Sequence, residues 1–392
     1  MSKINDLIKE MCPNGVEYKT IDEICYFQNG YAFKSSLFKS KGDILLRITN
    51  IDGKKIDLSD VKYIDVFDYS IDLSPFKVGS DEIVIAMSGA TTGKIGINRT
   101  GKLLYLNQRV GKITPRDDRM NNHFLYHYLL NKVNYFYQLA GGGAQPNLSS
   151  DAIKNTIIPI PPIEVQEEIV RILDKFNELE AELEAELEAR KSQYEFWRDK
   201  MFKQKGNIEI SNLFRRVKGT PITAGKMKEI ESHDGKIRIF AGGKTVVNAN
   251  IEDIPKANII DYPCVIVQSR GLIDFIYYDK PFTFKNEMWA YTCDNQITVK
   301  YLYYYLKNNV NYFRKIGTQM GSIPQISLPV TENFEVYLPS LEAQKRIVNI
   351  LDAFDKLVND ISEGIPEEIE LRKKQYEYYR NKLLNFEELK NE

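Results

Sequence analysis

IPPIEVQEEIVRILDKF (residues 160–176) recurs as LPSLEAQKRIVNILDAF (residues 338–354), so this chain of 392 residues carries one charged, amphipathic segment twice. The match extends upstream, where LYHYLLNKVNYF (125–136) pairs with LYYYLKNNVNYF (302–313). The two copies of the quoted segment start at residues 160 and 338, an interval far longer than the roughly 20–50 residues of a solenoid repeat. The sequence therefore predicts a tandem duplication of a whole domain followed by an arm.

Two shorter matches support the duplication. PNLS (146–149) pairs with PQIS (324–327), and RKSQYEFWRDKM (190–201) pairs with RKKQYEYYRNKL (372–383). The register of the last pair shows that the second arm carries four extra residues, near SEGIPEE (362–368). Each half thus consists of a large variable block and a more constant arm.

The arms are predicted to be helical, because their apolar residues recur three or four positions apart. A helix of about 40 residues reaches roughly 60 Å and cannot shield its own apolar stripe. The other arm is the expected partner in a coiled coil, and packing of each arm on its own domain is the alternative. Gly364 and Pro366 are expected to interrupt the second arm. The residues predicted to form the partner-binding and coiled-coil surface are Gln166, Ile169, Leu173, Phe176, Leu183, Leu187, Tyr194, Gln344, Ile347, Leu351, Phe354 and Tyr376.

The blocks between the arms contain short β-branched and aromatic runs bounded by Gly, Asp and Asn, such as DILLRITNI (43–51) and CVIVQS (264–269). A Tyr-rich helix, expected to contribute to the core, leads from each block toward its arm. The expected fold class is α+β, with two β-rich domains in tandem, two long helices and an internal pseudo-two-fold repeat. The predicted boundaries are a domain at 1–157, an arm at 158–204, a domain at 205–336 and an arm at 337–392.

Composition limits the class of protein. The net charge is −1, but the two blocks are basic, at +3 and +4, and the two arms acidic, at −5 and −3. No apolar run approaches the roughly 18 residues of a membrane span, and the start of the chain does not resemble a signal peptide. The four cysteines are scattered. The sequence indicates a reduced, cytoplasmic protein with no membrane partner.

Motifs for catalysis or metal binding are incomplete. MSGATTGKIG (87–96) has three residues instead of four between Gly89 and Gly93, so a hairpin with exposed Thr and Lys is expected rather than a phosphate loop. His123 and His127 lack the Glu and the third ligand of a zinc protease and are interpreted as helix-face residues. No catalytic residue and no metal site is predicted.

A nucleic-acid interface is the binding site that the sequence favours. Residues 84–135 carry a net charge of +6, with Asn and Gln among the basic residues. Lys and Arg neutralise phosphates, whereas Asn, Gln and Arg can read base edges in the major groove. The candidates in the first block are Lys34, Ser35, Arg47, Ser88, Thr91, Thr92, Lys94, Asn107, Gln108 and Arg109. Those in the second block are Thr220, Thr223, Lys226, Arg238, Lys244, Gln268, Ser269, Arg270, Lys285 and Asn286.

The whole pattern resembles a known family. Two variable β-rich blocks, each followed by a helix that opens Pro-(Pro/Ser)-(Ile/Leu)-Glu-x-Gln and closes Arg-Lys-x-Gln-Tyr-Glu, look like the specificity subunit of type I restriction–modification systems. The resemblance covers essentially the whole chain. Within the blocks, NGYAFKSSLF (29–38), MSGATTGKIGI (87–97) and the stretch at 218–245 also resemble that family's target recognition domains.

The resemblance implies a function. Each block would be a target recognition domain that reads one half of a split sequence in double-stranded DNA. The arms would pack as an antiparallel coiled coil, set the spacer between the half-sites and dock two methyltransferase subunits, which restriction subunits join. The chain would be non-catalytic, and S-adenosylmethionine, ATP and magnesium would belong to the partner subunits.

Two other functions remain open from the sequence alone. One is a coiled-coil assembly adapter whose domains bind protein, and the other is a self-contained nuclease. A further hypothesis concerns the Glu-Leu-Glu-Ala tract ending at Arg190. Because one tetrapeptide adds about 6 Å of helix, deleting Glu184–Leu187 is expected to shorten the DNA spacer without changing either half-site.

Overall fold

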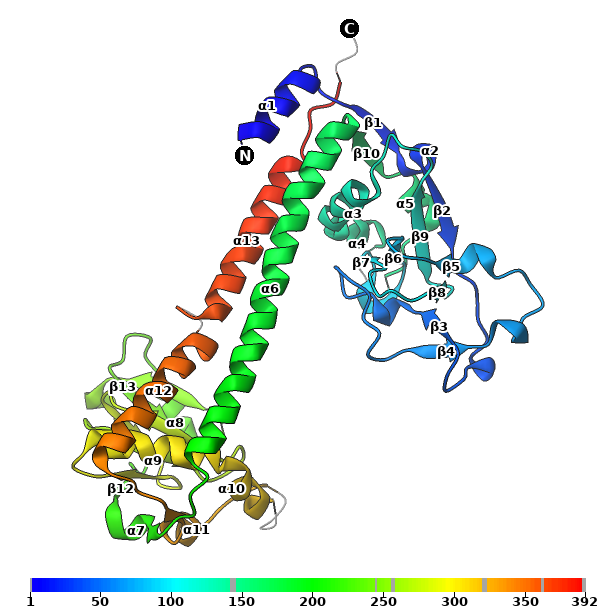
Figure 1. The fold of residues 1–392 in the computed structure, drawn as a ribbon. Coiled ribbons are helices and arrows are strands. Elements are labelled where there is room, and N and C mark those ends of the chain that lie inside the picture. The colour runs from blue at the N-terminus through cyan, green and yellow to red at the C-terminus, as the bar shows by residue number, and fades with distance from the viewer. Residues whose placement is uncertain are drawn as a thin grey trace. The chain divides into compact units, whose positions relative to one another are not determined.

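A computed structural model of the chain describes residues 2–141, 146–243, 245–254, 258–318, 323–360 and 363–389. Residues 1–182 and 369–392 form one compact unit, and residues 183–368 form another. Both units contain helices and small sheets (Figure 1). We refer to them as the first and second unit and describe each separately.

The first unit contains two sheets and a strand pair. One sheet has the order β2-β9-β6-β7 with antiparallel neighbours, and the other has the order β4-β3-β8-β5, in which β3 and β8 are parallel. Strand β1 pairs with β10. The strands are β1 (Glu17–Thr20), β2 (Cys25–Asn29), β3 (Asp43–Leu46), β4 (Lys62–Ile64), β5 (Lys77–Val78), β6 (Ile83–Ala86), β7 (Ile95–Ile97), β8 (Leu104–Leu106), β9 (Val110–Pro115) and β10 (Ile157–Ile160).

The second unit repeats the order of the larger sheet, and its smaller sheet lacks a counterpart of β5. Its sheets have the orders β12-β18-β15-β16 and β14-β13-β17, the second again with one parallel pair, β13 with β17, and β11 pairs with β19. The strands are β11 (Ile208–Glu209), β12 (Arg215–Lys218), β13 (Ile237–Phe240), β14 (Val246–Ala249), β15 (Cys264–Gln268), β16 (Asp274–Tyr278), β17 (Phe282–Phe284), β18 (Trp289–Thr292) and β19 (Glu335–Val336).

The helices also correspond between the units. Asn121 caps α3 and Asn295 caps α9, and each side chain accepts hydrogen bonds from two backbone N–H groups. Each of these helices is followed directly by a shorter helix. The helices are α1 (Ser2–Met11), α2 (Ile21–Ile24), α3 (Asn122–Asn131), α4 (Val133–Leu139), α5 (Ser150–Lys154), α6 (Ile163–Met201), α7 (Ile210–Leu213), α8 (Ala224–Glu229), α9 (Gln296–Asn308), α10 (Val310–Gly317), α11 (Leu328–Glu332), α12 (Leu341–Asn359) and α13 (Ile365–Leu383).

The β-rich blocks are confirmed, and the Tyr rows form core only in part, because Tyr135, Tyr137 and Tyr312 are more than 40% exposed. Tyr126, Tyr128, Tyr301, Tyr304 and Tyr305 are all buried, because α3 and α9 pack against the sheets. The strand expected at 43–51 is shorter than predicted. It ends at Leu46, and a 3₁₀ turn at 48–50 follows, in which the Asn50 amide donates to two loop carbonyls.

The arms combine the two kinds of packing that the sequence left open. At their starts they pack on their own domains: Leu173 lies in the core of the first unit and Leu351 in that of the second. Further along, another helix is the neighbour. In the first unit the Phe176 ring stacks on Tyr379, 5.4 Å between centroids, and in the second unit Tyr194 lies 6.0 Å from Phe354.

The interruption of the second arm is confirmed. Helix α12 ends at Asn359 and α13 begins at Ile365, with Pro366 in its first turn. A Cβ built on Gly364 would lie 2.6 Å from the Asp360 carbonyl oxygen, so a larger residue would not fit this backbone. Pro366 lacks an N–H group, and the first turn of a helix does not require one.

Candidate nucleic-acid interface

The glutamine that recurs in both arms attaches each arm to its own domain. The fully buried Gln166 amide accepts the Asn121 backbone N–H at 2.7 Å and donates to the carbonyls of Arg119 and Pro161. Gln344 accepts from the Thr298 hydroxyl at 2.8 Å and donates to the Pro339 carbonyl. The assignment of Gln166 and Gln344 to the helix–helix surface is therefore wrong: their side chains are used inside each unit.

An aspartate two turns further on makes a second attachment. In the first unit Asp174 accepts hydrogen bonds from His127 Nε2 at 2.9 Å and His123 Nδ1 at 3.4 Å. In the second unit Asp352 is bound by Lys300 Nζ at 2.7 Å and the Tyr304 hydroxyl at 2.5 Å. Equivalent positions of α3 and α9 thus carry different hydrogen-bond donors to the arm aspartate. The two histidines are not free helix-face residues.

These contacts change the protonation of the first unit's cluster. Burial by itself raises the pKa of the Asp174 carboxyl, but the hydrogen bonds from His123 and His127 bring it below its usual value. Burial lowers the pKa of His127, whereas the hydrogen bond to Asp174 raises the pKa of His123. His127 is therefore neutral near pH 7 and makes a hydrogen bond to a charged acceptor rather than an ion pair.

Sequence reasoning missed a third contact. The turn containing Lys54 reaches the tetrapeptide tract, where Lys54 Nζ lies 3.0 Å from a carboxylate oxygen of Glu180, a glutamate that is only 8% exposed. The Tyr126 hydroxyl donates to the Lys54 carbonyl. Nothing in the Glu-Leu-Glu-Ala pattern distinguishes Glu180 from its neighbours, because only the fold brings Lys54 to it.

The turn of the first unit's β6–β7 hairpin carries several predicted DNA contacts, most of them half-buried. The chain after β6 runs beside residues 146–148: Ser88 is bridged with Asn147, and Gly89 N–H donates to the Pro146 carbonyl at 3.3 Å. Arg109 Nη1 donates to Asn147 Oδ1 at 3.1 Å. We call this the 88/147 edge.

The second unit has the same arrangement. Arg270 is bridged with Gln325, Gly271 N–H donates to the Pro324 carbonyl at 2.8 Å, and Ile326 N–H donates to the Ser269 carbonyl at 2.8 Å. Gly271 has a φ of +78°, matching +75° at Gly89 in the first unit, a conformation that favours glycine. We call this the 270/325 edge. In the sequence Asn147 and Gln325 stand out only as members of the repeated PNLS and PQIS motifs, and their place at the edges comes from the fold.

The candidate residues differ in exposure. Lys34, Ser35, Gln108, Arg109, Thr223, Arg238, Arg270 and Asn286 are exposed. Arg47, Ser88, Thr91, Lys94, Asn107, Lys226 and Lys285 are half-buried. Lys244 lies outside the described residues. Several of the basic residues already have carboxylate partners: Lys226 lies 2.8 Å from Glu229, and Lys285 lies 2.8 Å from Glu287.

Four predicted DNA contacts are buried and are corrected to structural residues. Thr92 donates to the Gly89 carbonyl at 2.7 Å, so the β6–β7 hairpin is confirmed but its second threonine does not face solvent. Thr220 is fully buried and hydrogen-bonded to Thr283. Gln268 donates to the Gly243 carbonyl and Ser269 to the Glu287 carbonyl, at 2.7 and 2.8 Å. Buried polar groups need such partners, so these side chains are committed inside the fold.

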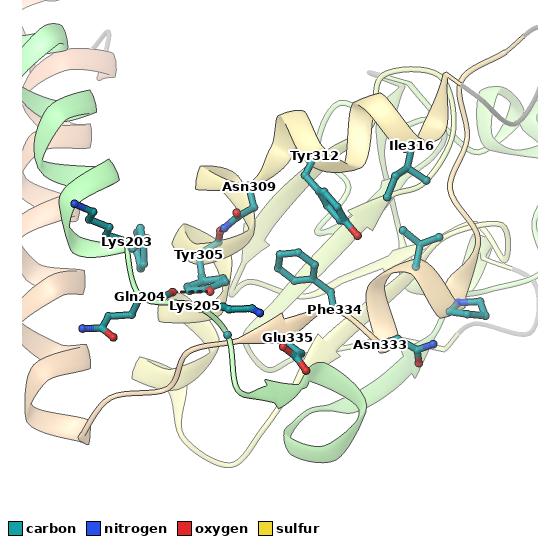
Figure 2. Close-up of a pocket in the computed structure, with 14 residues that line it drawn as sticks. Lys203, Gln204, Lys205, Tyr305, Asn309, Tyr312, Ile316, Asn333, Phe334 and Glu335 are labelled. Atoms are coloured by element: carbon teal, nitrogen blue, oxygen red, sulfur yellow. Dashed lines mark hydrogen bonds between the residues drawn. The ribbon is translucent and has the colours of Figure 1, made fainter.

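A separate concavity of about 840 Å³ lies in the second unit, where the chain leaves α6 (Figure 2). Tyr305, Tyr312 and Phe334 supply aromatic surface, and Lys203 and Lys205 come from the segment after α6. The Tyr305 hydroxyl donates to the Gln204 carbonyl at 3.4 Å. None of the predicted DNA contacts lines this concavity.

Within the described ranges no group of three or more His, Cys, Asp or Glu residues is arranged to hold a metal ion. Among the helices of the same ranges, none is long and apolar enough to cross a membrane.

Comparison with known proteins identifies the family. The model of the type I restriction modification DNA specificity domain matches residues 13–189 and again 203–371. A type I restriction enzyme specificity subunit of Escherichia coli is 32% identical over 61% of this chain and 65% of its own length, slightly under two thirds. A putative type I restriction enzyme specificity subunit of Haemophilus influenzae is 33% identical over 69% of this chain and 73% of its own length.

Solved structures show the same fold. The type I restriction–modification S subunit from M. genitalium aligns over 94% of this chain and 96% of its own, with a TM-score of 0.59 and 17% identity. A chain from a study of type I system assembly and conformational transition aligns over 95% and 98%, with a TM-score of 0.60 and 14% identity.

A protein built of two tandem mixed helix-and-sheet domains, each matched by a DNA specificity model, is a DNA-recognition subunit rather than an enzyme. The chain belongs to the type I restriction–modification DNA specificity family. These relatives do not support the alternative of an adapter whose domains bind protein. DNA and the other subunits of such a system are the partners that membership implies.

Proposed function

We propose that the chain reads a bipartite target in double-stranded DNA, one half-site with each domain. The observation that carries this proposal is the repeated edge: the larger sheet has the same strand order in both units and ends in the same paired loops, which carry different side chains. Two half-sites of different sequence require two domains with the same backbone arrangement and different side chains at the DNA-facing loops. Phosphate contacts then fix the position, and base contacts carry the sequence information.

The arms, in this proposal, form an antiparallel coiled coil that sets the spacer. Within the first unit the neighbours of α6 run in the opposite sense along α13: Phe176 lies beside Tyr379, and Glu180 lies 4.0 Å from Lys373. Each arm packs on its own domain at one end and on another helix further along, so a change in arm length would change the separation of the two domains. The pseudo-two-fold relation of the halves belongs to the same proposal.

The arms also offer surface for partner subunits. Phe196 is 60% exposed and Tyr378 is 61% exposed, although both lie on long helices. Large exposed aromatic residues are typical of protein interfaces. We assign two methyltransferase subunits to the arms, with restriction subunits joining the complex in the cytoplasm. S-adenosylmethionine, ATP and magnesium are assigned to those partners.

The test is to express the chain with its methyltransferase subunit and to map the methylated bases across a genome. Two short motifs separated by a fixed gap are expected. A single continuous motif would contradict the proposal. Binding to duplex DNA by the same complex should weaken as salt rises, because phosphate contacts release counterions. Mg²⁺-dependent cleavage by the chain alone would instead favour a nuclease.

A further inference from the structure

The 270/325 edge is built to present two side chains together. Arg270 and Gln325 are opposed in an antiparallel bridge, so their side chains leave the same face. Directly opposed residues of such a pair have Cβ atoms about 4.5–5.5 Å apart. Both residues are exposed, and neither side chain takes part in an ion pair or ring contact among the described residues.

The backbone of this edge is held on several sides. Gly243 N–H donates to the Arg270 carbonyl at 3.3 Å, and the Gly271 and Ile326 amides donate to Pro324 and Ser269 across the pair. The buried side chain of Gln268 fastens the loop at Gly243. The polar residues that precede Arg270 are therefore structural, and they keep Arg270 in place. Within the described part of the chain, no hydrogen bond of this scaffold uses the side chain of Arg270 or Gln325.

Arg270 differs from nearby basic residues in having no carboxylate partner among the described residues. Lys285 is neutralised by Glu287 at 2.8 Å, and Arg216 lies 3.8 Å from Glu332. An exposed guanidinium without a carboxylate keeps its fork of donors available for an outside acceptor. The fork of arginine matches O6 and N7 of guanine, and the amide of glutamine matches N6 and N7 of adenine.

We propose that Arg270 and Gln325 are the specificity-determining pair of the second domain. Arg270 reads a guanine, and Gln325 reads an adenine at a neighbouring base pair of the same half-site. The spacing fits, because side chains about 5 Å apart at their bases can reach base pairs stacked roughly 3.4 Å apart. The inference rests on the proposed function and names the bases that one edge recognises.

The first domain carries a different pair on the same scaffold. Ser88 replaces Arg270, and Asn147 replaces Gln325. The Oδ1 atom of Asn147 already accepts from Arg109 at 3.1 Å, so this amide is partly committed within the protein, unlike that of Gln325. The first half-site is therefore read by other contacts, and changes at the 270/325 edge should leave it unaltered.

The test uses the chain co-expressed with its methyltransferase partner and compares the wild type with Arg270→Ala, Arg270→Lys and Gln325→Ala. Genome-wide methylation mapping should show one guanine position of the second half-site becoming degenerate for Arg270→Ala and less strictly read for Arg270→Lys, and one adenine position becoming degenerate for Gln325→Ala. The expected loss of discrimination is roughly 5- to 150-fold at each position, as for one bidentate contact. The first half-site and the spacer should not change.

Lys280→Ala is the matched control, because Lys280 is an exposed cation in the β16–β17 turn of the same unit. This variant should at most weaken DNA binding by the same factor for all sequences, and no position of the recognition motif should become degenerate. An unchanged motif in Arg270→Ala, with binding and thermal stability intact, would overturn the inference. Failure of the wild-type complex to produce any bipartite motif would overturn the proposed function instead. Loss of all methylation in Arg270→Lys alone would also count against a base-reading role.

Discussion

Replacing Asp174 with alanine should destabilise the first unit. The carboxylate holds α6 to α3 through His127 and His123, at 2.9 and 3.4 Å, and His127 is fully buried. Alanine would leave the buried imidazole N–H of His127 without its acceptor, which costs more than losing a hydrogen bond at the surface. The first unit should become less stable, and the second unit should not.

The magnitude follows from these contacts. A hydrogen bond to a charged group contributes about 1.5–3 kcal/mol. Because the Asp174 side chain is 33% exposed, solvent screening places the loss near the lower end, at about 2 kcal/mol. For a unit of about 200 residues, 1 kcal/mol corresponds to a shift of roughly 2–4 °C in Tm. The first unit should therefore melt about 4–8 °C lower.

The assay is differential scanning calorimetry of the full chain, combined with hydrogen exchange of the α3 amides. Glu178→Ala is the matched control, because Glu178 lies one turn further along α6 and makes an exposed pair with Lys175 at 2.6 Å. Exposed pairs contribute about 0–1 kcal/mol. If Asp174→Ala shifts Tm no more than the control does, or leaves α3 exchange unchanged, the attachment argument is wrong.

Three further predictions concern the arms. Deleting Glu184–Leu187 should shorten the DNA spacer by about one or two base pairs with both half-sites kept, since the contacts of Asp174 precede the deletion; methylation mapping would refute this by showing an unchanged gap. Gln344→Ala should weaken the attachment of α12 to α9 and lower the second unit's Tm by about 2–4 °C, for about 1 kcal/mol lost, and an unchanged calorimetric trace would contradict it. Between pH 7 and pH 5, His127 takes up a proton in the unfolded chain, near its ordinary pKa of about 6.5, but burial lowers its pKa in the folded chain, so its contribution makes the protein less stable as the pH falls. The pKa of His123 is raised in the folded chain, so its contribution acts in the opposite sense. Stability measured against pH should therefore fall less in His127→Gln than in His123→Gln, and the reverse order would refute the assignment.

The duplicated sequence predicted much of the organisation. Identical spacing in LYHYLLNKVNYF and LYYYLKNNVNYF gave two equivalent helices, and Gly364 with Pro366 placed the break in the second arm. Periodicity succeeds here because helix faces and breaks depend on residues close together in the chain. It failed at the end of β3, where the turn depends on an Asn50 side chain bonded to carbonyls 7 and 10 residues away.

The candidate site was predicted only in outline. Composition located the basic blocks, but it could not separate Arg270 from Gln268 and Ser269, which are neighbours in sequence. In the fold Arg270 is exposed while the other two bind Gly243 and Glu287. Alternation along a strand fixes which face a side chain takes, but the loops that cover one face come from distant parts of the chain.

The sequence by itself determined the duplication and the helical arms, because these rest on local periodicity and on motifs that recur along the chain, and its motifs resembled those of the family. Only the tertiary structure decided which polar residues are available to DNA. Gln166 and Gln344 looked like partner-facing residues and are hydrogen-bonded within their own units, whereas Asn147 and Gln325 looked like repeat residues and lie at exposed edges. A polar side chain has the same chemistry in both places, and long-range packing alone determines whether its hydrogen bonds are made inside the protein or left for a ligand.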